Sequence, residues 1–204
     1  MRFSSQIFSL LLSASLLVLP APVFSVPDES PALEVAKKIS VPGVNNAGKV
    51  TEHLYRGAQP SLNELHELKK LGVTTIIDLR AESSGTAEQE RVRAESLGIK
   101  FLRIPIGGFA NPTNIELAHF FEVVRDSSSE TIFVHCEFGR DRTGVMIAAY
   151  RIAFENWTPE KALTEMMDFG FNRRWHPSMI TFVRNLPNRI QGDPQLQRAL
   201  KTNQ

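Results

Sequence analysis

The chain has 204 residues, of which 42% are hydrophobic, and its 23 Lys and Arg against 22 Asp and Glu give a formal net charge of +1. This length suits one domain with a single core. The near neutrality argues against nucleic acid as the main partner, so any positive potential at a site must be local.

The N-terminal segment has the layout of a secretory signal peptide. Arg2 precedes a run of 13 mostly apolar residues, Ile7 to Leu19, and small residues follow Pro20 up to Ser25. The run is shorter than the roughly 20 apolar residues that span a bilayer. We therefore expect residues 1–25 to be removed, leaving a periplasmic or secreted protein without stable membrane insertion. An uncleaved anchor is the alternative.

The rest of the chain is expected to form one domain. Residues 26–50 are rich in Pro, Ser, Asn and Gly, which predicts a linker or a loosely held N-terminal arm. We expect a phosphate-binding, catalytic domain over residues 51–190, as the motifs below indicate, and a polar tail over residues 191–204. We expect the protein to be a monomer.

Strand and helix patterns alternate along the domain. Pairs with capping-box spacing, such as Thr113 and Glu116, open several helices, and short β-branched or apolar runs lie between them. This alternation predicts an α/β fold with a central, mostly parallel sheet of four to five strands, flanked by helices. The expected strands cover 53–56, 73–79, 99–104 and 131–135, and the expected helices cover 62–71, 86–97, 113–126, 145–154, 158–169 and 177–186.

Cys136 is the single cysteine, so it cannot form an internal disulfide. A free thiol in an exported protein is either buried and inert or chemically employed. Its neighbours favour the second reading. It follows the predicted strand at 131–135 and precedes a helix, where a short loop can turn its N–H groups inward and the helix N-terminus adds positive charge. Such a site binds a dianion and stabilises a thiolate.

The loop sequence places Arg142 after five residues that follow Cys136. At this spacing the guanidinium can curl back and bind two phosphoryl oxygens through its planar fork. The intervening residues, which we expect to form the phosphate-binding loop with Arg142, are Glu137, Phe138, Gly139, Arg140 and Asp141.

The string HCEFGRDRTG resembles the signature of the protein tyrosine and dual-specificity phosphatase superfamily: His, Cys, five residues, Arg, Ser or Thr. The segments 55–60 and 76–80 resemble its compact bacterial and fungal branch, and 149–151, Trp157 and 165–166 resemble exported bacterial members. The resemblance implies that Cys136 attacks phosphorus, that Thr143 eases departure of the sulfur, and that His135 braces the loop. It implies catalysis without a cofactor, and no metal site is indicated.

One part of the family pattern is missing. Members usually carry an aspartate that protonates the leaving oxygen on the loop before the nucleophile strand, but the stretch from Ile106 to Asn114 contains no acid. Asp141 is one candidate for this role, with helix N-terminal capping as its alternative. Glu116 is another, although it has a structural role as the partner of Thr113. The third possibility is that no donor exists.

The missing acid predicts a substrate preference. A phenol leaves with a pKa near 10, whereas an aliphatic alcohol is more basic and depends more on proton donation. We therefore expect a phosphorylated protein as partner, with phosphotyrosine preferred over phosphoserine and phosphothreonine. The alternatives are an inositol-phosphate or other small phosphate-ester hydrolase, a phosphate-binding module without turnover and, last, sulfur transfer. The possible substrate rim comprises Arg56, Arg80, Phe109 and Asn111.

Overall fold

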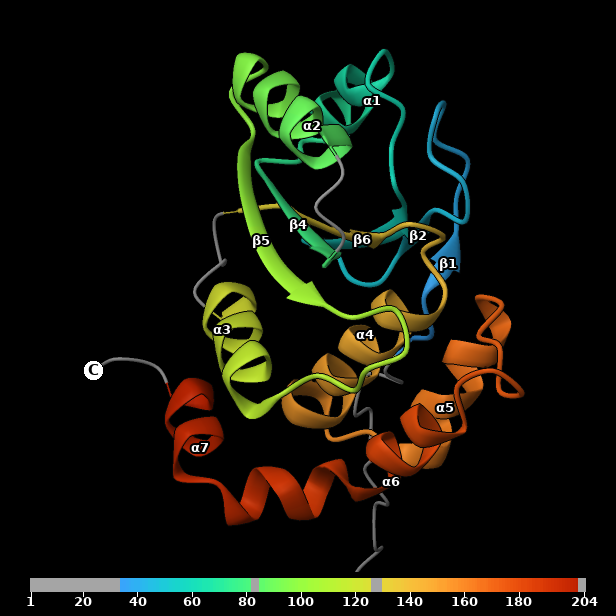
Figure 1. The fold of residues 1–204 in the computed structure, drawn as a ribbon, viewed down its shortest axis with the longest axis vertical. Coiled ribbons are helices and arrows are strands. Elements are labelled where there is room, and N and C mark those ends of the chain that lie inside the picture. The colour runs from blue at the N-terminus through green and yellow to red at the C-terminus, as the bar shows by residue number, and fades with distance from the viewer. Residues whose placement is uncertain (1–33, 82–84, 126–129, 202–204) are drawn as a thin grey trace, which may run out of the picture. The chain divides into compact units, whose positions relative to one another are not determined.

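The structure is a computed structural model that describes residues 34–81, 85–125 and 130–201 (Figure 1). The predicted signal peptide lies outside the described residues. The strands are β1 (Lys37–Lys38), β2 (Gly48–Lys49), β3 (Leu54–Ala58), β4 (Thr75–Arg80), β5 (Lys100–Ile106) and β6 (Ile132–Cys136). The helices are α1 (Leu65–Lys70), α2 (Gly85–Ser96), α3 (Asn114–Arg125), α4 (Asp141–Glu155), α5 (Pro159–Asp168), α6 (Pro177–Gly192) and α7 (Pro194–Leu200).

The sheet confirms the predicted α/β fold. Its strand order is β1-β2-β3-β6-β4-β5, and β3, β6, β4 and β5 run parallel to one another. The sheet has six strands rather than four or five, because β1 and β2 add a short antiparallel edge. The strand order makes β6 a central strand, hydrogen-bonded on both sides.

The extra edge strands come from the segment that we expected to be a linker. Between residues 34 and 50 the chain pairs with β3 and buries four small apolar side chains. The composition was misleading here because glycine and asparagine serve the turns, while every third position from 41 to 50 carries an apolar residue that reaches the core. These buried residues are Val41, Val44, Ala47 and Val50.

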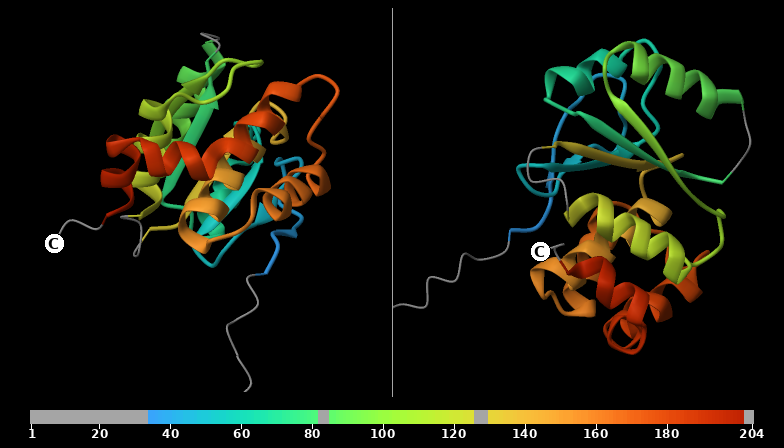
Figure 2. Two further views of the ribbon diagram at one scale, coloured as in Figure 1. Left: turned by 90° about the horizontal axis from the view of Figure 1, so that it is seen from below. Right: turned by 90° about the vertical axis from the view of Figure 1, so that its left-hand side faces the viewer.

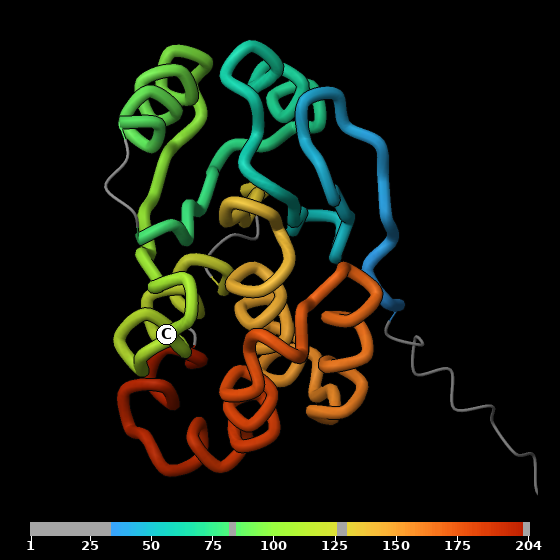
Figure 3. Tube along the Cα trace, turned by 45° about the vertical axis from the view of Figure 1, so that its right-hand side comes forward, coloured from blue at the N-terminus to red at the C-terminus, as the bar shows by residue number. Residues whose placement is uncertain are grey.

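Helices cover both faces of the sheet. Figures 1 and 2 show α1 and α2 on one face and α3 to α7 on the other. Each face has its own apolar core, one centred on β4, β6 and α4 and the other on α1 and the N-terminal segment. All five residues of β6 are buried, as expected for a strand packed on both sides. Figure 3 traces the chain from β6 through a tight turn into α4.

The C-terminal region is more ordered than predicted. Helix α6 continues to Gly192, and α7 packs on α3 where we expected a polar tail. Asp193 caps α7, since its carboxylate accepts the backbone N–H groups of Gln195 at 2.8 Å and Leu196 at 3.1 Å. Leu196 and Ala199 are buried, so the predicted tail is wrong over residues 191–201. These two residues are three positions apart and so share one face of the helix.

Among the residues that the structure describes, none of the helices combines the length and apolarity needed to cross a bilayer.

Candidate active site

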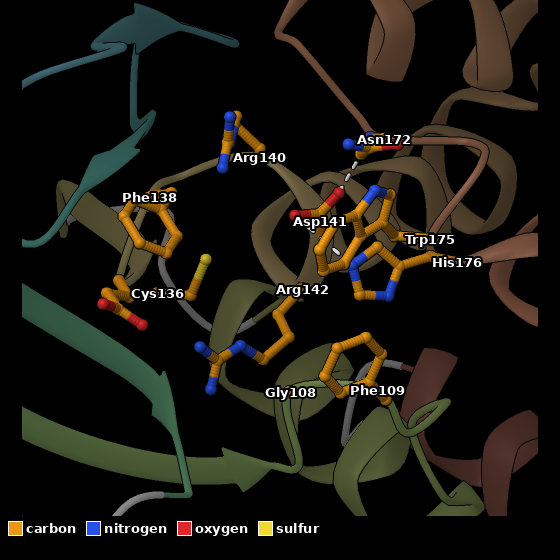
Figure 4. Close-up of a pocket in the computed structure, with 11 residues that line it drawn as sticks. Gly108, Phe109, Cys136, Phe138, Arg140, Asp141, Arg142, Asn172, Trp175 and His176 are labelled. Atoms are coloured by element: carbon orange, nitrogen blue, oxygen red, sulfur yellow. Dashed lines mark hydrogen bonds and ion pairs between the residues drawn. The ribbon is translucent and has the colours of Figure 1, made fainter.

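A pocket of about 370 Å³ lies beyond the carboxyl end of β6 (Figure 4). This is where ligands bind in open parallel sheets. Three stretches line it: the β5–α3 loop, the turn from β6 into α4, and the α5–α6 loop. The lining residues are Gly108, Phe109, Cys136, Glu137, Phe138, Arg140, Asp141, Arg142, Asn172, Trp175 and His176.

Cys136 is the last residue of β6 and reaches the floor of this pocket. Its surface is only 3% exposed, but Figure 4 shows the sulfur pointing into the pocket. The turn that follows begins at Glu137, and α4 starts at Asp141. The thiol is therefore covered by its own loop while remaining accessible to a small ligand from the pocket side.

The turn offers hydrogen-bond donors to an anion. The backbone N–H groups of Phe138, Gly139 and Arg140 have no hydrogen-bond partner within the part of the chain that the structure describes. The N-terminus of helix α4 has no side-chain cap hydrogen bond. Consecutive free N–H groups at a helix N-terminus form an anion-binding nest.

The turn is held from behind by Arg56. Its Nη2 donates to the carbonyl of Gly139 at 2.9 Å, and its guanidinium lies 4.0 Å from the ring centre of Phe169. Arg56 is fully buried, so its predicted place on the substrate rim is wrong. Burial lowers the pKa of Arg56 to about 10, although the charges of Glu165 and Cys136 act in the opposite direction. The role of this residue is to fix the loop.

Gly139 occupies a position that only glycine fits. Its φ is +66°, and a Cβ there would lie 2.3 Å from the carbonyl carbon of Gly57 on β3. We expect Gly139→Ala to lower the free energy of unfolding by about 2–3 kcal/mol, because both the backbone conformation and the contact are unfavourable. Urea unfolding followed by circular dichroism measures the change.

Gly85→Ala is the matched control. A Cβ at Gly85 meets no atom within 4 Å, and its φ is not in the left-handed region. We expect it to change the free energy of unfolding by no more than about 0.5 kcal/mol. Equal unfolding midpoints for the two variants would contradict the close approach of the loop to β3.

His135 connects the nucleophile to a buried charged network. Its Nδ1 lies 3.2 Å from the carbonyl oxygen of Cys136, and its Nε2 lies 2.9 Å from Glu90 Oε1. Glu90 also accepts from Arg80 at 2.7 Å, and Arg80 pairs with Asp78 at 2.7 Å. Arg80 is 3% exposed, so it does not belong to the rim either. Burial alone would raise the pKa of Asp78, but hydrogen bonds from Arg80 help to hold it below its usual value.

Arg142 and Thr143 lie where the loop enters α4. Arg142 lines the pocket with 6% of its surface exposed, and its Nη1 donates to the carbonyl of Ile106 at 3.3 Å. Figure 4 shows its side chain extending toward the Cys136 side of the pocket. The hydroxyl of Thr143 is buried and has no hydrogen-bond partner among the described residues. The predicted nucleophile and phosphate clamp therefore share one pocket.

The two candidate acids have different surroundings. Glu116 accepts the backbone N–H of Thr113 at 2.6 Å and its hydroxyl at 2.8 Å, which is the predicted capping box, and it does not line the pocket. Asp141 does line the pocket. Its Oδ1 accepts the backbone N–H of Asn172 at 2.9 Å, and its Oδ2 lies 3.7 Å from His176 Nε2. Asp141 joins two parts of the pocket wall instead of capping α4.

The pocket mouth is aromatic. Phe109, which was predicted for the rim, lines the pocket and is 68% exposed. Phe138 and Trp175 are also exposed there, and Arg140 lies 4.9 Å from the ring centre of Phe138. Asn111 does not line this pocket, and its side-chain oxygen is buried. Of the four predicted rim residues, Phe109 lines the pocket, whereas Arg56, Arg80 and Asn111 do not.

The α5–α6 loop contributes another wall. From the sequence, Arg173 and Arg174 near Trp175 could line the pocket mouth, but a solvated turn is the favoured interpretation there. The structure places Asn172, Trp175 and His176 of this stretch in the pocket lining. No local spacing links this stretch to the loop after Cys136. Only the packing of α5 and α6 against α4 brings the two segments together.

A comparison with protein-family models matches residues 31–176 to the family described as DSP-PTPase phosphatase fused to NAD+ kinase. The dual specificity protein phosphatase TpbA of Pseudomonas aeruginosa is 27% identical over 130 residues, which cover 62% of this chain and 55% of the relative. The inositol diphosphatase DSP1 of Oryza sativa subsp. japonica is 27% identical over 134 residues, covering 64% and 59%. The chain thus spans little more than half the length of these relatives.

Solved structures share the fold. A cysteine-to-serine variant of P. aeruginosa TpbA in complex with phosphotyrosine has a TM-score of 0.65 at 21% identity, over 86% of this chain and 99% of that chain. The catalytic domain of the Saccharomyces cerevisiae phosphatase SIW14 in complex with citrate has a TM-score of 0.62 at 20% identity, over 81% and 100%. Since the family match spans well over half of the sequence, the chain belongs to the DSP-PTPase phosphatase family.

Proposed function

We propose that the protein hydrolyses phosphate monoesters through a phosphocysteine intermediate on Cys136, with protein phosphotyrosine as its preferred substrate. The observation that carries the proposal is the meeting of the Cys136 sulfur and the Arg142 side chain in one pocket, beside a turn whose N–H groups at residues 138–140 have no partner among the described residues. That combination suits a dianionic phosphoryl group.

In the first step the Cys136 thiolate attacks phosphorus as the ester bond breaks. The free N–H groups of the turn and the guanidinium of Arg142 bind the equatorial oxygens as charge shifts onto the leaving oxygen. In the second step water attacks the phosphocysteine and releases phosphate. The buried hydroxyl of Thr143 is suited to stabilise the departing thiolate, and His135 holds the carbonyl of Cys136 from behind.

The rim supports an aromatic substrate. Phe109, Phe138 and Trp175 can flank a phenyl ring, and aromatic pairs contribute beyond simple burial. A polyphosphorylated inositol would require several free cations instead. Arg56 and Arg80 are buried elsewhere, which leaves Arg140 as the cation beside Arg142 in the pocket lining. The name of the rice relative keeps an inositol phosphate as the second candidate.

Purified protein is expected to hydrolyse a phosphotyrosine peptide with a kcat/KM at least about tenfold above that for the same peptide carrying phosphoserine or phosphothreonine. Phosphorylated inositols are expected to be poorer substrates than the phosphotyrosine peptide. The rate of inorganic phosphate release measures hydrolysis of the three peptides and of the phosphorylated inositols. Equal kcat/KM values on the three peptides would remove the preference, and faster hydrolysis of the inositols would favour the second candidate.

We also propose that the protein belongs to an exported bacterial branch of the family and acts in the periplasm or outside the cell. The support is the sequence of residues 1–25, with Arg2 before a short apolar run. Protein from expressing cells should lack this segment. A mature chain that still begins at Met1 would contradict the proposal.

A further inference from the structure

The pocket contains a proton donor candidate that the family pattern does not supply. The β5–α3 loop has no carboxylate, and Glu116 lies outside the pocket. Apart from Cys136 and the two arginines, the titratable side chains that line the pocket are Glu137, Asp141 and His176. Of these, Glu137 belongs to the exposed side of the turn, which leaves Asp141 and His176 on the opposite wall.

Asp141 already serves as a hydrogen-bond acceptor. Its Oδ1 takes the backbone N–H of Asn172, and its Oδ2 faces the Nε2 of His176 at 3.7 Å. The N–H of Asn172 occupies Oδ1, so only Oδ2, which faces His176, could carry a proton. The arrangement fits an aspartate that holds a neighbouring imidazole in one orientation.

His176 is held on three sides. It immediately precedes α6 and is 8% exposed, and its ring stacks on Phe109 with centroids 5.0 Å apart. Phe171 contacts the ring from the α5–α6 loop at 6.1 Å between centroids. Its Nδ1 is buried without a hydrogen-bond partner among the described residues.

Figure 4 shows the ring of His176 across the pocket from Cys136, beside Asp141. The charged groups that share this pocket with it are Asp141, Glu137, Arg140, Arg142 and the Cys136 thiolate.

We propose that His176, oriented by Asp141, is the general acid and base of the reaction, an inference that rests on the proposed function. As Cys136 forms the S–P bond, the P–O ester bond breaks and its electron pair stays on the leaving oxygen. The imidazolium of His176 gives that oxygen its proton. In the second step the neutral imidazole takes a proton from the attacking water, the S–P bond breaks, and the thiolate and imidazolium are restored.

This donor changes the basis of the substrate preference. The preference for aryl esters was expected because no acid was available, whereas with His176 it depends on the aromatic rim. A general acid must be protonated to donate, so a donor in this position gives the pH profile a basic limb that disappears when the donor is removed.

The test compares His176→Gln with wild type on phenyl phosphate and on 4-nitrophenyl phosphate, whose leaving group is the stronger acid. We expect kcat on phenyl phosphate to fall about 100-fold and kcat on 4-nitrophenyl phosphate to fall less than about tenfold. The basic limb of the pH profile should disappear on phenyl phosphate. A structural defect would lower both rates equally and leave the shape of the profile unchanged, and that result would overturn the inference.

Two further variants complete the design. Asp141→Asn should retain the basic limb and lower both rates by a similar factor, of about tenfold or less. If it removes the limb while His176→Gln keeps it, Asp141 is the donor and the inference is wrong. His66→Gln, at a partly exposed histidine on α1 outside the pocket, is the matched control and should stay within about twofold of wild type. Wild-type protein without activity, or activity that survives Cys136→Ser, would instead overturn the proposed function.

Discussion

Replacing Cys136 with serine is expected to lower kcat by at least about 10⁴-fold, the scale of loss seen when a covalent nucleophile is removed. A thiol ionises far more readily than an aliphatic hydroxyl, so the serine oxygen would remain protonated and unreactive at neutral pH. The N–H groups of the turn and the side chain of Arg142 are unchanged by the substitution. Binding of a phosphorylated peptide should therefore survive.

The two halves of this prediction are measured separately. Steady-state hydrolysis of a phosphotyrosine peptide gives the loss in kcat, and calorimetry with the same peptide gives the dissociation constant of the serine variant. Cys136→Ser with a rate within tenfold of wild type would mean that another group attacks phosphorus. Loss of peptide binding together with loss of activity would indicate that the substitution has disturbed the loop.

Arg142→Lys is expected to lower kcat by about 10²–10³-fold even though the charge is retained. The planar fork of arginine can bind two phosphoryl oxygens at once, whereas the ammonium of lysine is a point charge. Lysine would also lose the fixed approach given by the contact of Arg142 with the carbonyl of Ile106. Because the two phosphoryl contacts strengthen as the transition state forms, the effect should fall mainly on kcat and less on KM.

Arg140→Lys provides the matched comparison. Arg140 lines the same pocket but lies over the exposed ring of Phe138 at the mouth. Its replacement should cost less than about tenfold in kcat/KM, since it adds an exposed charge and a cation–π contact. Equal losses in the two lysine variants would contradict the assignment of Arg142 as the specific phosphate clamp.

Much of the fold follows from local sequence signals. The strands after residue 50 lie within a few residues of their predicted positions, because short β-branched runs bounded by glycine have few alternatives. The capping pair Thr113 and Glu116 is present with the predicted reciprocal bonds. Cys136 and Arg142 come from one contiguous segment. They meet in the pocket because the chain turns from β6 into α4 between them.

The errors have a different origin. In sequence, Arg56 and Arg80 read as surface or salt-bridged cations. In the structure Phe169 covers Arg56, and Arg80 is buried against Asp78 on its own strand and Glu90 on α2. A buried arginine is recognisable only when its partners are known. The edge strands and α7 were missed for a related reason, since short segments gain their stability from the tertiary surface on which they dock.

The pocket wall formed by Asn172 and His176 illustrates the limit most directly. Asp141 and Asn172 are 31 positions apart, and their hydrogen bond exists because α4, α5 and α6 pack together. Nothing in the spacing of either residue indicates a shared site. Contacts of this kind define which groups can transfer protons, so the sequence alone left the donor open.

The most direct test of the central claim is a rapid-quench experiment with a radiolabelled phosphotyrosine peptide, followed by mass spectrometry of the protein. We expect a covalent phosphoryl group on Cys136 during turnover and its complete absence in Cys136→Ser. A phosphoryl group on any other residue, or labelling that persists in the serine variant, would contradict phosphoryl transfer through this cysteine.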